Sequence, residues 1–501
     1  MMLDKLEKKR LYRLCEMLPG ILVWLTFALA IGLSVWKPLW AIYFIIIFDL
    51  YWFLRVGYLM LNILMAWRLY RHNIKIDWLP KAHALPRFDD IYHIVFFPTY
   101  KEPYEVLDHS LGSMTQIKYP HDKMIVVLAG EMRDHDNFKR HAAKLTQKYG
   151  QHFFKFLVTY HPADIVGEMA GKGSNINWAG QRAQELIDEL KIPYANIVVS
   201  TFDADTCPHQ SYFAYLTYLF LTVPDPLHSS YQPVALYNNN IWESYAITRT
   251  VANATTFWLL SDMARPERLF TFSSHSMPWQ ALIDVGFWQN DIVTEDSRIF
   301  WQCFVRYDGN YRVTPMFMPV SMDTVYTGSF WQTMVNQYKQ QRRWAYGAEN
   351  LPYLILYSVW GKHIPWAKKA RYLWNMLEGY YSWATAPIII FLLGRLPLYF
   401  VGPDEGASLI IYNAPQTLRW LMMLAMIGLV LSAVLSTILL PPKPANRSPF
   451  RYVLMVLQWV LFPVAMIIFG SIPATDSQTR LLTGKYLGFW VTTKHRESAN
   501  S

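Results

Sequence analysis

The chain has 501 residues, of which 53% are hydrophobic and 16% are aromatic, and its mean hydropathy is +0.10. This hydropathy is high for a soluble enzyme and low for a pure channel, so we expect a soluble domain joined to membrane helices. The formal net charge is +9, but no basic stretch carries a recognisable nucleic-acid-binding motif, which argues against a nucleic-acid partner. Cys15, Cys207 and Cys303 are too few and too scattered for a disulfide framework, in keeping with a reducing compartment.

The N-terminal region, residues 1–70, contains two apolar runs. Residues 21–36 carry no charge, and residues 39–67 are interrupted only by Asp49 and Arg55. We expect each run to form a transmembrane helix.

A cleavable signal peptide is the alternative for the first run, because Ala28-Leu29-Ala30 resembles a cleavage site. The apolar sequence continues beyond that point into the second run, which favours membrane helices. Lysines and arginines concentrate beside the apolar runs, and the positive-inside rule places these flanks in the cytoplasm. We therefore expect a multi-pass protein of the inner (plasma) membrane, with membrane lipids among its partners and a cytoplasmic polar domain.

Between residues 88 and 350, apolar segments of strand length alternate with amphipathic segments of helix length. Strands are expected at residues 91–97, 124–128, 154–158 and 197–202. The alternation predicts a doubly wound, mostly parallel α/β sheet. Ligands of such sheets bind beyond the carboxyl ends of the strands. Three of these strands run directly into the polar segments Pro98-Thr99-Tyr100, Gly130-Glu131 and Asp203-Ala204-Asp205.

Asp203 and Asp205 form an Asp-x-Asp pair directly after a buried strand. Two carboxylates this close repel each other unless a cation neutralises them. Mg²⁺ or Mn²⁺ prefers such oxygen ligands when it bridges the phosphates of a nucleotide-activated donor. An Asx turn or helix cap at residues 206–209 is the alternative for an isolated pair. Together with the two clusters that follow, the pair favours a site for Mg²⁺ or Mn²⁺.

Thr294, Glu295 and Asp296 open a predicted helix. Thr294 could cap this helix while the two acids favour its dipole. The same acids are candidate catalytic residues, because a hydroxyl nucleophile must lose its proton as it attacks. Asp296 is the expected general base, and both interpretations can hold together.

Gln340, Arg343 and Trp344 lie at positions i, i+3 and i+4 of a predicted helix and so share one broad face. Arg343 can bind phosphate oxygens through two donors, and Trp344 offers a flat apolar surface to a sugar ring. The alternative is an interfacial helix whose arginine and tryptophan contact lipid headgroups.

The C-terminal third returns to the membrane. Residues 351–372 are basic and aromatic and indicate an interfacial segment. Residues 373–474 contain about three apolar segments, and residues 475–501 form a tail. Three full crossings would place this tail outside the cytoplasm. Pro463 in the last apolar run could make that run a re-entrant hairpin, or one of the preceding runs does not cross.

The ordered clusters resemble the membrane-embedded family 2 glycosyltransferases, the group of cellulose, chitin and hyaluronan synthases, over nearly the whole chain. The resemblance implies a Rossmann-like GT-A domain inserted between transmembrane helices. Asp203 and Asp205 match the family's Asp-x-Asp, Asp296 its Thr-Glu-Asp base, and residues 340–344 its Gln-x-x-Arg-Trp motif. Asp205, with Asp203, would then hold the metal, and Trp344 the acceptor.

Further donor-binding residues follow from the same resemblance. The segment Gly171–Asn177 is similar to the family's Lys-Ala-Gly-Asn-Leu-Asn, so Lys172 is expected to face the donor nucleotide. The full donor-binding set implied is Thr99, Tyr100, Glu102, Glu131, Lys172, Asp203, Gln340 and Arg343. A gating loop like that of cellulose synthases is expected at Phe489, Val491, Thr492 and Lys494.

Several positions depart from the family pattern. Glu131 stands where the family has a second pair of aspartates, and Phe272–Ser276 replaces its acceptor-binding Phe-Phe-Cys-Gly-Ser. His275 in this segment could contact the acceptor or be a packed or solvent-facing histidine. Thr493 replaces the gating-loop proline.

The function expected from these features is inverting transfer of a hexose from a UDP-sugar to the growing end of a β-linked polysaccharide, coupled to passage through the membrane. The alternatives are transfer of a single sugar to a lipid acceptor and a non-catalytic membrane transporter or scaffold. A periplasmic or export partner is not identified by the sequence.

Overall fold

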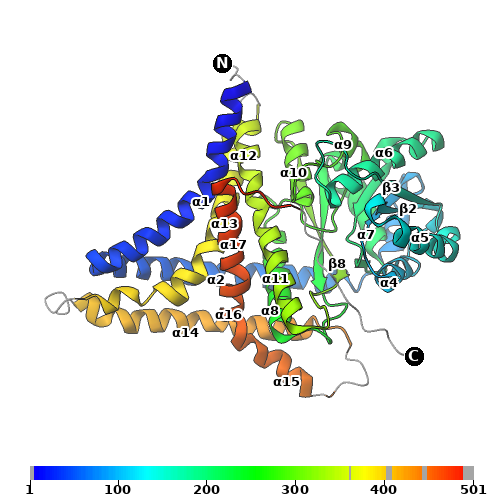
Figure 1. Cartoon of the computed structure of the whole chain (residues 1–501). Helices are drawn as coiled ribbons and strands as arrows, with labels where there is room; N and C mark the ends of the chain where they lie inside the picture. The colour runs from blue at the N-terminus through cyan, green and yellow to red at the C-terminus, as the bar shows by residue number, and fades with distance from the viewer. Residues whose placement is uncertain (1–4, 360–362, 402–408, 443–447, 449, 489–501) are drawn as a thin grey trace.

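The computed structural model describes residues 5–359, 363–401, 409–442, 448 and 450–488. Figure 1 shows an α/β domain on one side and long helices that extend away from it on the other. The expected α/β domain between sets of apolar helices is therefore confirmed.

The domain is built on one eight-stranded sheet with the order β3-β2-β1-β4-β7-β6-β8-β5. Its strands are β1 (Tyr92–Pro98), β2 (Met124–Glu131), β3 (Lys155–His161), β4 (Ile197–Thr201), β5 (Cys207–Pro208), β6 (Ser229–Tyr237), β7 (Ser276–Pro278) and β8 (Arg312–Met322). The strands β3, β2, β1 and β4 are mutually parallel, as the alternation of strand-length and helix-length segments predicted. The short β7 joins this half to the parallel pair of β6 and β8 by antiparallel pairing.

The register of the parallel strands brings their polar ends to one edge. Pro98 of β1 is opposite Ala129 of β2, and Glu131 of β2 is opposite His161 of β3. Thr201, at the end of β4, is opposite Phe96. The segments that follow β1, β2 and β4 therefore meet at the same edge, as the topology predicted.

Helices cover the sheet and carry the remaining motifs. They are α3 (Trp78–His83), α4 (Tyr104–Met114), α5 (His135–Tyr149), α6 (Lys172–Leu190), α7 (Tyr212–Thr222), α8 (Ala246–Met263), α9 (Trp279–Asp284), α10 (Glu295–Arg306), α11 (Phe330–Ala345) and α12 (Asn350–Leu354). The predicted helix starting at the acids is α10, and the predicted helix bearing Gln340, Arg343 and Trp344 is α11. The indole of Trp78 on α3 packs against the ring of Tyr215 on α7, with centroids 4.2 Å apart, so close packing onto the domain begins before residue 88.

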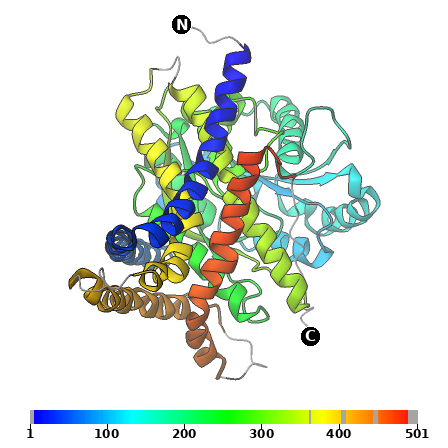
Figure 2. The same ribbon diagram turned by 60° about the vertical axis from the view of Figure 1, so that its left-hand side comes forward.

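Five helical segments of the described chain are long and apolar enough to cross a membrane, at residues 6–36, 38–73, 366–399, 415–438 and 450–483. Four of them, containing α1 (Lys5–Trp36), α2 (Pro38–Asn73), α13 (Trp366–Ile388) and α14 (Leu409–Ile438), extend away from the domain (Figures 1 and 2). The two apolar runs predicted before the domain and the three predicted after it are all helical.

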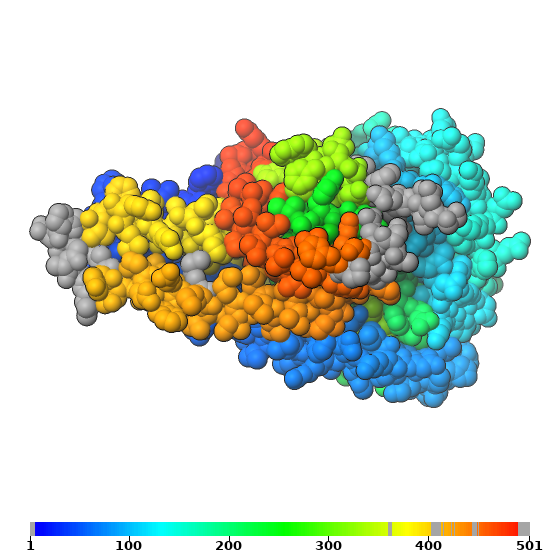
Figure 3. Space-filling view, turned by 90° about the horizontal axis from the view of Figure 1, so that it is seen from below, coloured from blue at the N-terminus to red at the C-terminus, as the bar shows by residue number. Residues whose placement is uncertain are grey.

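The fifth segment comprises α15 (Phe450–Leu457), α16 (Phe462–Met466) and α17 (Ile472–Thr483), which are joined by a 3₁₀-helical turn (Gln458–Leu461) and a π-helical turn (Ile467–Ser471). It lies along the boundary between the domain and the projecting helices (Figure 3). Nε of Arg249 on α8 donates to Oε1 of Gln458 at 2.7 Å, and Arg342 on α11 pairs with Asp476 at 2.9 Å. The segment therefore lies between α8 and α11 on one side and the projecting helices on the other, where Oγ of Ser471 donates to the carbonyl of Trp383 on α13.

The end of α17 returns to the N-terminal part of α1. Nη2 of Arg13 donates to the carbonyl of Leu482 at 2.7 Å, and a Cβ on Gly20 would lie 2.6 Å from the carbonyl oxygen of Gln478. The two helices can cross this closely because residue 20 has no side chain. The last described residues therefore lie on the domain's side of the projecting helices. The last apolar run is not a hairpin at Pro463, because residues 450–483 continue as successive helical segments without a reversal. The number of full membrane crossings after the domain stays a prediction.

Candidate functional site

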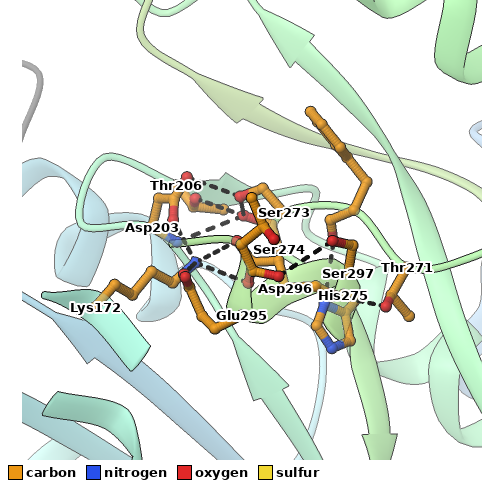
Figure 4. A network of polar contacts seen from close by, with 12 residues as sticks. Lys172, Asp203, Thr206, Thr271, Ser273, Ser274, His275, Glu295, Asp296 and Ser297 are labelled. Carbon is orange, nitrogen blue, oxygen red and sulfur yellow. Dashed lines mark hydrogen bonds and ion pairs between the residues drawn. The ribbon is translucent and has the colours of Figure 1, made fainter. Parts of the chain in front are cut away.

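The Asp-x-Asp cluster and the Thr-Glu-Asp cluster meet at one lysine at the sheet edge (Figure 4). Nζ of Lys172, the first residue of α6, donates to Oδ1 of Asp203 at 2.7 Å. It also donates to both carboxylate oxygens of Asp296, each at 2.9 Å. The site thus joins the end of β4 to the N-termini of α6 and α10. We expected Lys172 to face a nucleotide, and its two carboxylate partners were not anticipated.

Hydroxyl groups of a serine and a threonine also hydrogen-bond to Asp203 and Asp296. Oγ of Ser273 donates to Oδ2 of Asp203 at 2.7 Å, and Oγ1 of Thr271 donates to the carbonyl oxygen of Asp296 at 2.5 Å. Both come from the segment before β7, which also contains His275 (Figure 4). These contacts fix the two acids relative to each other.

The charges of the cluster are buried and coupled. Burial lowers the pKa of Lys172, but the carboxylates of Asp203, Asp296 and Glu295 outweigh it and raise that pKa above its usual range. The side chain of Glu295 is 1% exposed and lies 3.8 Å from Nζ of Lys172. Burial, reinforced by the charge of Asp296, raises the pKa of Glu295 to about 8. One ammonium thus faces three carboxyl groups, one of which has a raised affinity for a proton.

One cavity of about 660 Å³ opens onto this cluster and extends between the projecting helices. Its lining includes nearly all the predicted donor, base and acceptor residues: Thr99, Tyr100, Glu102, Glu131, Lys172, Asp203, Glu295, Asp296, Gln340, Arg343 and Trp344. It continues along residues of α2, α13, α14 and α16. The sheet edge and the apolar helices therefore share a single continuous space.

Asp205 and His275 are placed differently from the other predicted residues. Asp205 is fully buried, and its Oδ2 accepts a hydrogen bond from the backbone N–H of Asp323 at 2.7 Å. His275 is 1% exposed, and its Nδ1 lies 3.0 Å from the carbonyl oxygen of Phe272. Burial lowers the pKa of His275 to about 4. Neither residue lines the cavity, and of the alternatives for His275 the structure has the packed one.

Of the Asp-x-Asp pair, only Asp203 is accessible to a divalent cation in the cavity. Asp203 lines the cavity with its side chain 28% exposed. Within the described ranges, no group of three or more His, Cys, Asp or Glu side chains is arranged to hold a metal ion. This donor set fits Mg²⁺ or Mn²⁺ in the mode in which one or two carboxylates and the substrate's phosphates share the ion. Asp203 is the residue that could hold it, and the role predicted for Asp205 stays a prediction.

Glu131, a predicted donor-binding residue, is buried at the end of β2. Its Oε2 accepts a hydrogen bond from Nε of Arg133 at 2.6 Å. Burial raises the pKa of Glu131, and the Arg133 guanidinium opposes that shift. Arg133 also lies over the ring of Tyr100, 4.5 Å from its centroid. Glu131, Arg133 and Tyr100 therefore contact one another in sequence, next to the end of β1.

The helix α11 presents the Gln-x-x-Arg-Trp motif to the cavity. Gln340, Arg343 and Trp344 all line it. The indole of Trp344 packs against Tyr237 and Phe272, with ring centroids 5.9 and 5.8 Å away. This platform faces the cavity shared with Asp296.

The predicted gating-loop residues Phe489, Val491, Thr492 and Lys494 lie outside the described residues. The chain just before them is close to the Thr-Glu-Asp segment. Leu487 packs with the cluster of Val293 and Tyr346, and its backbone N–H lies 3.4 Å from the Tyr346 hydroxyl.

Sequence reasoning missed a clamp that holds the start of α10. Oε1 of Glu349 accepts hydrogen bonds from the backbone N–H of Thr294 at 3.1 Å and from its hydroxyl at 2.6 Å. Nε of the buried Arg298 donates to Oδ1 of Asn350 at 2.6 Å. The Thr294 hydroxyl therefore does not cap its own helix. The only available signal was the polar pair Glu349-Asn350 next to the apolar sequence of α12.

The family model described as "Glycosyl transferase family group 2" matches residues 198–475, more than half of the chain. The chain belongs to this glycosyltransferase family. The match includes the Asp-x-Asp, Thr-Glu-Asp and Gln-x-x-Arg-Trp segments and extends into α17. No curated protein matches the chain.

Solved structures of glycosyltransferases resemble this family member at low identity. A mannosyltransferase, PcManGT from Pyrobaculum calidifontis, in complex with GDP-Man and Mn²⁺, is 14% identical with a TM-score of 0.43. The match covers 85% of this chain and 100% of that one. TarS 1–349 from S. aureus, in complex with UDP-GlcNAc, is 12% identical with a TM-score of 0.37, covering 79% of this chain and 93% of that one.

Proposed function

We propose that this glycosyltransferase transfers a hexose from a UDP-sugar, with inversion at the anomeric carbon, to the hydroxyl of an acceptor held in the cavity between the sheet edge and the projecting helices. The observation that carries the proposal is the single cavity lined by Lys172, Asp203, Asp296, Arg343 and Trp344. It brings a cationic donor end, a carboxylate and an aromatic platform into one space. The protein would lie in the inner (plasma) membrane with this domain in the cytoplasm.

Each residue has a role that its position allows. Asp296 would accept the proton of the acceptor hydroxyl as that oxygen attacks the anomeric carbon and the bond to the diphosphate breaks. Lys172 and Arg343 would bind the negative charge that develops on the departing UDP. Asp203 would hold Mg²⁺ or Mn²⁺, and the bound ion supplies further positive charge for the diphosphate. Trp344 would stack on the acceptor's terminal sugar.

The first candidate for the acceptor is the growing end of a β-linked polysaccharide. The cavity supports it, because tryptophans such as Trp52, Trp258 and Trp383 line its continuation among the helices and suit sugar rings. Passage of the product through the membrane is part of this candidate. A predicted gating loop at the C-terminus would act on the same side, since Leu487 packs beside Val293.

The second candidate is a single sugar transfer to a lipid. It is favoured by the charged residues Arg55, Asp262, Arg265, Arg268 and Glu378, which line the cavity at the boundary between the helices and the domain. Such a group suits a lipid headgroup.

The test is UDP release by the purified protein in lipid nanodiscs, with a panel of UDP-sugars and with Mg²⁺ or Mn²⁺. Asp296→Asn is expected to lower turnover by about 10²- to 10⁴-fold, the usual contribution of a general base. The matched control is Asp291→Asn, an exposed carboxylate five residues earlier, which should leave turnover unchanged. Unchanged turnover in Asp296→Asn would refute the assigned base. Turnover of a GDP-sugar with none of any UDP-sugar would overturn the uridine assignment.

The number of sugars in the product separates the two acceptors. Incubation with a labelled UDP-sugar should give long chains if the acceptor is a polysaccharide. A product one sugar longer than its acceptor would reject the polymer candidate and leave the lipid.

A further inference from the structure

A group of charged side chains lines the cavity away from the catalytic cluster and has no part in the proposed chemistry. Arg55 of α2 pairs with Glu378 of α13, and Arg265 pairs with Asp262 at the end of α8. Arg268 lies within electrostatic range of all four. The group therefore contains three arginines and two carboxylates, and Arg268 is the cation in excess.

Two polar atoms in this group have unused hydrogen-bonding capacity. Among the residues that the structure describes, Nε of Arg268 and Oδ1 of Asn375 are buried without a hydrogen-bond partner. Asn375 is 6% exposed, and its Nδ2 donates to the carbonyl of Arg268 at 3.2 Å. Both residues line the cavity. Burying an unpaired donor and an unpaired acceptor is costly unless a ligand pairs them.

The position of the group links it to the catalytic cluster. Arg268 precedes Thr271 by three residues, which is at most about 11 Å of extended chain. The Thr271 hydroxyl donates to the carbonyl oxygen of Asp296 (Figure 4). One or two sugar rings are long enough to span this distance. A molecule whose anionic group binds Arg268 could thus place a sugar hydroxyl near Asp296.

The surroundings indicate a lipid rather than a soluble anion. Val56 and Met60 of α2, Met376 of α13 and Leu429 of α14 line the same part of the cavity between the apolar helices. Arginine binds phosphate oxygens through two parallel donors and tolerates apolar surroundings better than lysine does. Ionisable residues at such a position generally mark a ligand pathway.

We propose that Arg268 and Asn375 form a subsite for a membrane lipid whose sugar is attached through a phosphate, with Arg268 on the phosphate and Oδ1 of Asn375 accepting from a sugar hydroxyl. The subsite rests on the second acceptor candidate and defines it as an anionic, lipid-linked sugar. Arg55 and Arg265 are neutralised by Glu378 and Asp262, so they do not compete for the phosphate and Arg268 supplies the net positive charge of the group.

The test compares two probes that differ only by the phosphate: glucosyl dodecyl phosphate and dodecyl glucoside. Native mass spectrometry of the purified full chain measures how much of each is bound, and inorganic phosphate serves as a competitor. The wild-type protein is expected to bind the phosphate probe about 10- to 100-fold more tightly, as one charge-assisted contact provides. Arg268→Gln should abolish this preference, and Arg268→Lys should retain part of it.

The controls keep the outcome decisive. Arg140→Gln, an exposed arginine on α5, should retain the full preference. Asn375→Asp adds a charge that repels phosphate, and it should lower binding of the phosphate probe alone even if Arg268→Gln fails to fold. Three results would each overturn the lipid subsite. The wild type could bind the two probes equally, the preference for the phosphate probe could survive both Arg268→Gln and Asn375→Asp, or equimolar inorganic phosphate could displace the probe. Absence of UDP release together with an intact probe preference would instead refute the proposed sugar transfer.

Discussion

Replacement of Lys172 by methionine tests how the catalytic cluster is held together. The lysine donates to Asp203 and Asp296, lies 3.8 Å from Glu295, and has a side chain that is 9% exposed. Methionine keeps the approximate volume and removes the charge, so the carboxylates would face one another without a cation. Removing one partner of a buried ion pair typically costs about 3–5 kcal/mol. Because Asp203 and Asp296 are partly exposed, at 28% and 21%, we expect the lower end, about 3 kcal/mol.

The assay is thermal unfolding in detergent with a chelator present. For a domain of this size, about 3 kcal/mol corresponds to a decrease of roughly 6 to 12 °C in Tm. Lys172→Arg should lose much less, because it retains the charge. Lys139→Met, at an exposed position on α5, controls for the loss of a lysine elsewhere. Mn²⁺ should recover part of the stability of Lys172→Met if Asp203 binds the ion. An unchanged Tm of Lys172→Met in chelator would refute the view that the ammonium holds the acids together.

Three further predictions concern neighbouring features. The pKa of Glu295 is raised from 4.5 to about 8, so between these pH values the folded state binds more protons than the unfolded state. The free energy of unfolding should therefore fall as the pH rises from 4.5 to about 8. Glu295→Gln should flatten this dependence, as measured by unfolding experiments at pH 5.5 and 8.5. Gly20→Ala should destabilise the α1–α17 crossing by about 1–3 kcal/mol, because its Cβ would meet the carbonyl of Gln478, and an unaltered Tm would show that the helices can separate freely. Glu349→Ala leaves two donors of Thr294 without their acceptor and should cost about 1–3 kcal/mol and reduce turnover, whereas full activity would mean that the clamp does not position the base.

The α/β domain could be predicted because its signals are local. Apolar runs of strand length, such as Met124 to Leu128, alternate with segments of helix length, and the four predicted strands became the parallel half of the sheet. The spacing of Gln340, Arg343 and Trp344 likewise predicted one helical face. The antiparallel insertion of the three-residue β7 carried no comparable signal, since so short a strand is stabilised by its neighbours rather than by its own pattern.

The membrane region was predicted in number but not in arrangement. Hydropathy identifies a helix as apolar, but it does not distinguish a lipid-facing surface from one that packs on protein. The segment at residues 450–483 satisfies the same criteria as the other four, and its contacts with Arg249 and Arg342 show what covers it. The chain that follows this segment packs on the domain, where Leu487 contacts the cluster of Val293 and Tyr346.

The sequence by itself determined the family-like order of motifs, the sheet and the edge at which its polar segments meet, because strand periodicity and strand direction follow from neighbouring residues. Only the tertiary structure decided that Asp203 faces the cavity while Asp205 is buried, and that Lys172 joins Asp203 to Asp296. Lys172 and Asp296 are 124 residues apart, and their contact depends on how α6 and α10 pack against one sheet edge. Charge neutralisation across such a distance leaves no periodic trace in the sequence, so it appears only when the chain is folded.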